Sequence, residues 1–371
     1  MKKNLFLLLF YSFLLHLPMF SQNPPWKNAL KMAWSSDGVT FGASSIFQDS
    51  AGVPSVIRWK GDTLITAFQW FRQPNPSPTW DRVAVKFSYN NGLTWTAPTP
   101  IIVNGIPSTY QRPFDPTLVL LAGDSLRMYF SSSATMQMGG LDSMVDTYSA
   151  TSLDGIHYVF EPTPRVNHLT NRLIDPAVIY FNNSWHYASP IGAPQAGAYH
   201  YVSPNGVNFS AVANIPSDNL HNWTGNYMVE SSTELRFYGS GGTIWYNSSP
   251  NGGIWNGYVN TNLTNAGDPS VLKIADGNYL IIYVGLTPLT DIESSDNEED
   301  KVLIYPIPCD NSLTIRLTTV SQTTYLLRNQ LGEVVRQGEI SALTTQINTA
   351  DLPPAIYFLE IQHKKYKVVK G

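Results

Sequence analysis

A short phrase recurs along this chain and constrains the fold more than any other feature. Its clearest copy runs from Phe114 to Leu121 and is followed by a Gly123-Asp124 turn and a second apolar run. Each copy reads as strand, tight turn and strand, because β-branched and aromatic residues fill the runs and Gly, Asn and Asp fill the turns. The five copies begin near Val53, Phe114, Ile174, Gly225 and Gly267, of which the first lacks the Asp and the fourth is degraded.

A second phrase, Ser-x-Asp/Asn-x₀₋₁-Gly followed by an aromatic residue, alternates strictly with the first. Its copies begin at Ser35, Ser88, Ser152, Ser203 and Ser249, so they are 53, 64, 51 and 46 residues apart (88−35, 152−88, 203−152, 249−203). The Asp or Asn turns the chain and Gly supplies a positive φ, so we expect the Asp and Asn residues here to be structural. A period near 50 residues with four strands per repeat predicts a β-propeller.

The order of the phrases predicts how the ring closes. The series opens with a turn phrase at Ser35 and ends with a hairpin phrase at Asp268, so neither end holds a complete blade. We expect residues 29–48 to complete the sheet that contains residues 268–285, because this pairing removes two open sheet edges. The predicted fold class is therefore all-β, with a five-bladed β-propeller over residues 29–286 and a small β-sandwich after it.

The segments outside the repeats have distinct compositions. Residues 1–21 have two lysines before an apolar stretch and read as a signal peptide, too short to serve as a membrane anchor. Residues 22–28 form a Pro-rich lead-in, and residues 287–300 carry six acids and no base, as a solvated linker does. We expect no transmembrane anchor to remain after cleavage.

Residues 301–371 read as a separate domain of alternating strands, which indicates a β-sandwich. Its motifs are Tyr-Pro-x-Pro at 305–308, Leu-Gly at 331–332, Leu-x₃-Ile-Tyr at 352–357 and a basic last strand ending in Val-Val-Lys. This combination resembles the C-terminal sorting domain of the type IX secretion system of Bacteroidota, although Cys309 and Pro354 depart from its usual Ala or Gly. The resemblance implies that the type IX secretion machinery is a partner and that the protein is secreted or held at the cell surface after crossing the periplasm.

Charge and cysteine content exclude several classes of protein. The formal net charge is −4, so the chain shows no basic footprint for nucleic acid or for a membrane surface. A single cysteine, Cys309, rules out an internal disulfide framework. No metal-ligand spacing, Ser–His–Asp order or phosphate-binding loop is present; calcium in the channel would suit Asp ligands, but nothing in the sequence specifies it, and no cofactor is expected.

Three aspartates hold the same position in three of the hairpin phrases. Asp115, Asp175 and Asp268 each precede a Pro at a predicted inner strand, and such strand starts meet at one mouth of a propeller. Arg112 and Arg172 stand three residues before the first two, where a guanidinium can hold a carboxylate or a sugar hydroxyl. Two interpretations stay open: the three aspartates form a shared functional mouth, or each of them only caps its own turn.

The fourth hairpin phrase carries polar and aromatic groups in place of the Asp. His221, Trp223 and Asn226 suit a sugar ring, so we list them with Arg112, Arg172 and Asp268 as candidate substrate-binding residues. Packing in the core or at the rim is the alternative for Trp223.

Two family resemblances concern the propeller. Ser88-x-Asn90-x-Gly92-x-Thr94-Trp95 resembles the Asp-box of sialidases, with Asn in place of Asp. The Asp-Pro strand starts and the count of five blades resemble glycoside hydrolase families 43 and 32, which implies an Asp base, an Asp that tunes a pKa and a Glu acid on different blades. Asp115 and Asp175 match two of these, whereas Val53 stands where a further Asp would be.

The acid of such an enzyme is the open question in this sequence. Glu230 is the nearest candidate for the third catalytic residue, although the alignment of the repeats puts it past the middle of its strand. Glycoside hydrolysis needs two carboxyl groups of opposed pKa. Three functions therefore stay open: a secreted propeller that binds and hydrolyses glycans as five-bladed glycosidases do, a noncatalytic glycan-binding or surface scaffold propeller, and a sialidase-like exo-glycosidase.

Overall fold

The computed structural model describes residues 28–71, 81–134 and 144–285, and in the C-terminal part residues 302–305, 309–317, 323–330, 332–361 and 364–370. The expected signal peptide, nearly all of the lead-in and the expected acidic linker lie outside the described residues. The chain divides into two compact units, residues 1–289 and 290–371. Each unit is considered by itself.

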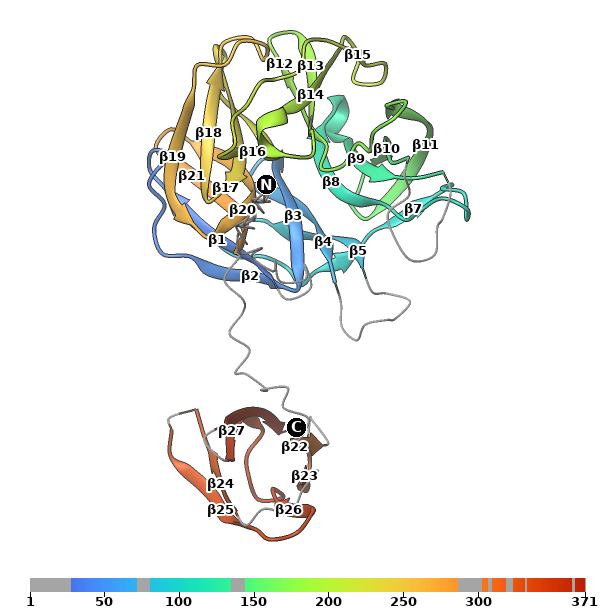
Figure 1. The fold of residues 1–371 in the computed structure, drawn as a ribbon. Helices are drawn as coiled ribbons and strands as arrows, with labels where there is room; N and C mark the ends of the chain where they lie inside the picture. The colour runs from blue at the N-terminus through green and yellow to red at the C-terminus, as the bar shows by residue number, and fades with distance from the viewer. Residues whose placement is uncertain are drawn as a thin grey trace, which may run out of the picture. The chain divides into compact units, whose positions relative to one another are not determined.

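The described part of the first unit consists of five β-sheets that surround a central axis (Figure 1). The innermost strands are β3 (Ala51–Lys60), β8 (Phe114–Leu120), β12 (Ala177–Phe181), β16 (His221–Ser231) and β20 (Ala266–Ala275). Each of them contacts the next, and β20 contacts β3, so the ring is closed. The sheets are therefore the blades of a propeller.

Three blades follow the simple order of the repeat, with strands that pair antiparallel in chain order. The first continues from β3 with β4 (Thr63–Trp70), β5 (Arg82–Ser88) and β6 (Thr99–Pro100). The third continues from β12 with β13 (Ser184–Pro190), β14 (Ala198–Ser203) and β15 (Ser210–Ala211). The fourth continues from β16 with β17 (Glu234–Gly241), β18 (Thr243–Ser249) and β19 (Tyr258–Thr264).

The second blade has one more strand than the repeat predicts. It continues from β8 with β9 (Leu126–Ser132), β10 (Asp146–Ser152), β11 (His157–Val166) and then β7 (Ile102–Asn104). Strand β7 comes from the connection that follows the first blade, and it pairs in parallel with β11. This pairing covers the outer edge of the sheet, which would otherwise expose unpaired backbone groups.

The fifth blade joins the two ends of the propeller sequence. Strands β20 and β21 (Asn278–Gly285) are followed in the sheet by β1 (Ala29–Ser35) and β2 (Ser45–Asp49). Strand β1 pairs with β21 over its whole length, from Ala29 opposite Gly285 to Ser35 opposite Tyr279. The expected closure by residues 29–48 is present in the structure.

The five turn phrases form the same turn between the third and fourth strands of each blade. The Ser hydroxyl accepts the Gly N–H at 2.8 to 3.0 Å, and φ of these glycines lies between 70° and 90°. An added Cβ at Gly252 would lie 2.3 Å from the His186 ring of the preceding blade. The phrase thus fixes each turn and also packs it against a neighbouring blade.

The core lies between the faces of adjacent blades. Ile65 and Phe87 of the first blade and Met128 and Phe130 of the second belong to one buried apolar cluster. Buried residues run without a break along middle strands such as β4 and β21, as expected for sheets covered on both faces.

The second unit is a sandwich of two sheets around its own core. One sheet has the order β22 (Val302–Tyr305), β23 (Ser312–Leu317) and β26 (Thr344–Asn348). The other has the order β25 (Val334–Ile340), β24 (Thr323–Arg328), β27 (Ala355–Ile361) and β28 (Lys364–Lys370). Leu313, Leu327 and Leu359 are fully buried between them, and Cys309 is a buried free thiol. Both units confirm the predicted all-β fold, a propeller followed by a small sandwich.

Candidate functional site

The innermost strands share a local backbone feature at the end of the propeller where they begin, which we call the mouth. Val53, Asp115, Asp175 and Asp268 have φ of 48°, 50°, 49° and 45°, and each precedes a Pro. The pairing with the next strand is interrupted here in β3, β8 and β20. Asp tolerates this left-handed conformation better than most residues, so a repeated bulge turns three carboxyl groups toward one opening.

The three carboxyl groups interact with one another at the mouth. The backbone N–H of Asp175 donates to Oδ2 of Asp115 at 3.2 Å. Burial is the largest cause that raises the pKa of each group, to about 7 for Asp115 and to about 6 for Asp268. Burial and then the charges of Asp115 and Asp268 raise the pKa of Asp175 well above its ordinary value. Three such groups cannot all ionise easily near neutral pH.

A small cavity lies next to two of these three carboxyl groups. A cavity of about 10 Å³ is lined by Asp175 and Asp268 together with Thr117 and Asn226, so it has room for about one water molecule. Asn226 is buried and its amide donates to the Pro54 carbonyl at 3.0 Å. The side chain of Asn226 thus links two inner strands across the channel, which corrects the expectation that it would contact a substrate directly.

The two arginines near the mouth behave differently from each other. Arg112 pairs with Asp81 at 2.5 Å, and the charge of Asp81 in turn raises the pKa of Asp115. Arg172 is exposed and forms no ion pair with another residue in the described part of the chain. The expected direct pairs of Arg112 with Asp115 and of Arg172 with Asp175 are therefore absent from the interactions among described residues.

Asp81 is a residue of this region that the sequence analysis missed. It stands just before β5 and has a φ of 55°, like the three aspartates of the mouth. It belongs to neither repeated phrase, so the repeats gave no signal for it. Gln69 of β4 also bonds to its carboxylate.

In the fourth blade the candidate residues serve the blade itself. His221 stacks on Tyr258 with ring centroids 3.8 Å apart, and its Nδ1 lies 2.7 Å from Asp218. Trp223 is 1% exposed and packs against Phe237 and Trp245. Its ring is a core residue, so the expectation that it would offer a platform to a sugar is wrong.

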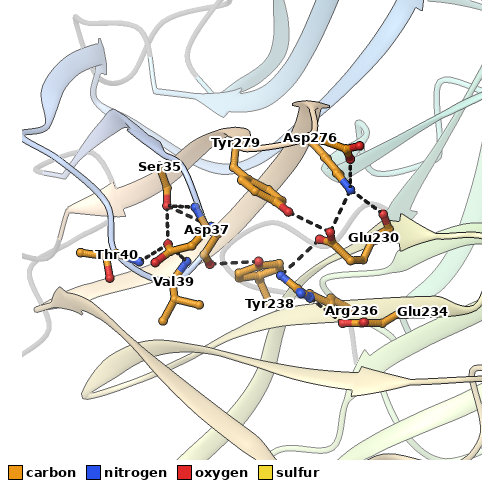
Figure 2. A network of polar contacts seen from close by, with 12 residues as sticks. Ser35, Asp37, Val39, Thr40, Glu230, Glu234, Arg236, Tyr238, Asp276 and Tyr279 are labelled. Atoms are coloured by element: carbon orange, nitrogen blue, oxygen red, sulfur yellow. Dashed lines mark hydrogen bonds and ion pairs between the residues drawn. The ribbon is translucent and has the colours of Figure 1, made fainter.

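Glu230 lies near the far end of β16, four residues beyond Asn226 and thus about 13 Å along the strand from the mouth. Figure 2 shows it among the groups at that opposite end of the propeller, where Tyr279 donates to its carboxylate at 2.8 Å. Lys273 and Arg236 lie 2.9 and 3.2 Å from it. Glu230 is therefore neutralised by two cations far from the aspartates, and it is not the acid partner of Asp115 and Asp175.

The described residues include no group of three or more His, Cys, Asp or Glu side chains arranged to hold a metal ion. Within the same residues, no helix has the length and apolar character needed to cross a bilayer.

Comparison with known proteins adds a family for the second unit. Residues 303–371 match the family described as the secretion system C-terminal sorting domain. This confirms the type IX sorting domain expected from the sequence, and it indicates export to the cell surface or into the medium. A search of curated proteins found no match.

Solved structures with partial structural similarity to this chain include two glycoside hydrolases and a sialidase. The GH32 β-fructofuranosidase BmSUC1 of Bombyx mori has a TM-score of 0.48 at 12% identity, over 94% of this chain and 89% of that chain. The family 117 glycoside hydrolase Zg3597 of Zobellia galactanivorans has a TM-score of 0.44 at 8% identity, over 71% and 92%. The Hadza microbial sialidase Hz136 has a TM-score of 0.43 at 13% identity, over 66% of this chain and 55% of that chain. All three TM-scores are below 0.5, so these similarities assign no activity to this chain.

Proposed function

We propose that this exported protein is a glycan-active propeller that binds a polysaccharide or oligosaccharide at the mouth and hydrolyses it. The observation that carries the proposal is the convergence of Asp115, Asp175 and Asp268, whose pKa values are all raised. A glycosidase needs one carboxyl group that holds a proton and another that is ionised. The mouth supplies both near neutral pH.

The chemistry follows from the coupling of the three groups. The three groups lose their protons in successive steps, and each step is a property of the three groups together, because each ionisation makes the next one harder. A protonated carboxyl can give its proton to the oxygen of the scissile glycosidic bond, while an ionised neighbour activates water or attacks the sugar carbon. The cavity next to two of these groups is too small for a sugar ring, so the glycan would meet them from the open side of the mouth.

Noncatalytic glycan binding is the second candidate. It is favoured by the position of Glu230 at the opposite end and by the use of Asp115 as an acceptor for a backbone N–H. Under this alternative the aspartates would fix the mouth and bind hydroxyl groups without transferring a proton.

The test uses the full chain after removal of the export signal. Arabinan, xylan, fructan and sialylated substrates are screened for binding and for released sugar, with wild type beside Asp115→Asn, Asp175→Asn and Asp268→Asn. We expect hydrolysis of one class and a loss of about 10²- to 10⁴-fold in the variant that removes the acid or base. Binding without release would support the second candidate, and the absence of both would contradict the proposal.

Asp124→Asn is the matched control for these variants. Asp124 also has a positive φ, 58°, but it is exposed and lies in the turn at the other end of the second blade. Asn keeps the backbone conformation at this position, and the carboxylate that is removed lies outside the mouth. We expect activity equal to that of wild type.

A further inference from the structure

Val53 is the residue of the mouth whose backbone conformation suits its side chain least. Its φ is 48°, in the left-handed region, which a β-branched residue rarely enters. The following residue, Pro54, restricts it further. The equivalent positions in three other blades hold Asp, which tolerates this conformation.

The three residues that follow Val53 are held by hydrogen bonds to other inner strands. The carbonyl of Pro54 accepts the amide of Asn226 from across the channel at 3.0 Å. The N–H of Val56 donates to Ser270 of β20 at 3.0 Å, and Ser55 accepts the N–H of Leu118 of β8 at 2.9 Å. The surroundings therefore impose the strain, and strain of this kind concentrates at functional sites.

Val53 lies between two of the acidic residues of the mouth, Asp115 and Asp268. Strand β3 lies between β8, which carries Asp115, and β20, which carries Asp268. Val53 lines the same small cavity as Asp175 and Asp268. It is thus an apolar side chain at a place where the repeat would otherwise add a fourth carboxylate.

We infer that Val53 is a positioning residue, whose apolar side chain keeps water and further charge away from Asp115, Asp175 and Asp268 so that a proton stays among them at neutral pH. The raised pKa values of the three groups agree with this inference, because burial is the largest cause in each. The inference deepens the proposed function, which needs that proton, but it can be tested without any glycan.

The other charged groups around the mouth are few. Asp115 faces it from β8, Asp175 from the segment before β12 and Asp268 from β20, while Asp81 interacts with Asp115 and is itself paired with Arg112. Two further arginines belong to this region: Arg82 at the start of β5, which interacts with Asp81 and Arg112, and the exposed Arg172. Strand β16 contributes the uncharged Thr224, Gly225 and Asn226 to the cavity. Replacing Val53 therefore changes the polarity next to the carboxyl groups without removing a charged partner.

The experiment compares two replacements, Thr and Ile, which are β-branched like Val and disfavour a positive φ to the same degree. Carboxyl carbons of ¹³C-labelled aspartate are followed by NMR over pH in the full chain, and signals are assigned with the three Asp→Asn variants. In Val53→Thr the added hydroxyl should lower the midpoints of the mouth carboxyls by about one pH unit. Val53→Ile keeps the side chain apolar and should leave them within a few tenths of a unit of wild type.

Unchanged midpoints in Val53→Thr would overturn the inference, as would equal shifts in both variants, because packing rather than polarity would then be the cause. If Val53→Thr does not fold, Val53→Asn replaces it, since Asn accepts a positive φ and should fold at least as well as wild type. Failure of the proposed function shows separately, as a wild-type chain that hydrolyses nothing. If the wild type is active, the alkaline limb of its pH profile should move to lower pH in Val53→Thr.

Discussion

The inner strands of the propeller carry acidic residues at both ends, but the two ends treat them in opposite ways. At the mouth, three carboxyl groups lie together, and the nearby Arg112 is paired with Asp81 rather than with any of them. At the opposite end, Glu230 lies between Lys273 and Arg236 and also accepts the Tyr279 hydroxyl. At the mouth the acidic groups raise one another's pKa or are shielded from water, whereas at the opposite end the acid is neutralised by cations.

Removing Glu230, the acid at the opposite end, is the strongest test of this difference between the two ends of the propeller. Glu230→Ala leaves Lys273 and Arg236, which are both partly exposed, without their shared partner. Because Asp276 still pairs with Lys273 and Glu234 with Arg236, we expect a loss of about 2 kcal/mol in the free energy of unfolding. Chemical denaturation measures this loss, and the titration of the mouth carboxyls should not change. Glu234→Ala is the control, since Glu234 is more exposed and pairs with Arg236 alone among the cations that the structure describes, and it should cost less than about 1 kcal/mol.

A second prediction concerns a turn at the opposite end. Gly252→Ala combines a φ of 77° with a Cβ that would meet the His186 ring, so we expect it to destabilise the fold by about 2 kcal/mol. Gly61→Ala also has a positive φ but meets no atom within 4 Å, so its loss should be smaller, about 1 kcal/mol. Equal losses for the two glycines would show that the contact between blades contributes little.

The mouth itself predicts an unusual dependence of stability on pH. The folded pKa values of Asp115 and Asp268, about 7 and about 6, lie above the ordinary value of 3.8, so the folded state binds more protons than the unfolded state between these limits. The contribution of these groups is present below pH 3.8 and is lost as pH rises toward 7. Asp175→Asn should therefore stabilise the protein at pH 7 by about 1 to 2 kcal/mol and flatten this slope.

Denaturation curves at several pH values check this prediction, with Asp124→Asn as the unchanged control. A loss of about 1 kcal/mol in Asp175→Asn at pH 7, as for a removed cap, would instead assign the aspartates a turn-capping role.

The smallest effect is expected from a buried histidine pair in the third blade. His186 and His200 lie 3.4 Å apart between ring nitrogens, and burial lowers the pKa of His200 to about 4. A lowered folded pKa means that stability is lost as pH falls below the ordinary value of 6.5, which opposes the slope of the mouth. His200→Gln should reduce that acid-side loss by about 1 kcal/mol, visible as a weaker decline in stability from pH 6.5 to 4. An unchanged decline would locate the acid sensitivity elsewhere.

The repeats made the blades and the mouth predictable, because equivalent residues of a repeated unit must take equivalent places. They placed Asp115, Asp175 and Asp268 at the starts of three inner strands and led to the pairing of β1 with β21. They failed where the repeat is irregular. The register of β16 shifts between Asn222 and Gly225, and Trp223, inside this interval, is buried in its own blade.

Two other features escaped the repeat for physical reasons. Asp81 lies outside both phrases, and its closeness to Asp115 depends on how two blades meet rather than on any sequence spacing. Strand β7 has only three residues and forms because an exposed edge of the second blade is available to it. Local sequence carries little information about either contact.

The pairing of β21 has a mechanical consequence. It is the last strand of the propeller before the chain continues to the sorting domain, and it lies between β1 on one side and β20 on the other. Tension applied to the propeller through its C-terminal end would act along β21. The hydrogen bonds that join β21 to β1 and to β20 run across that direction, so the force would load them together in shear. The blade would therefore resist the force with all of these bonds at once, and they would not break one after another.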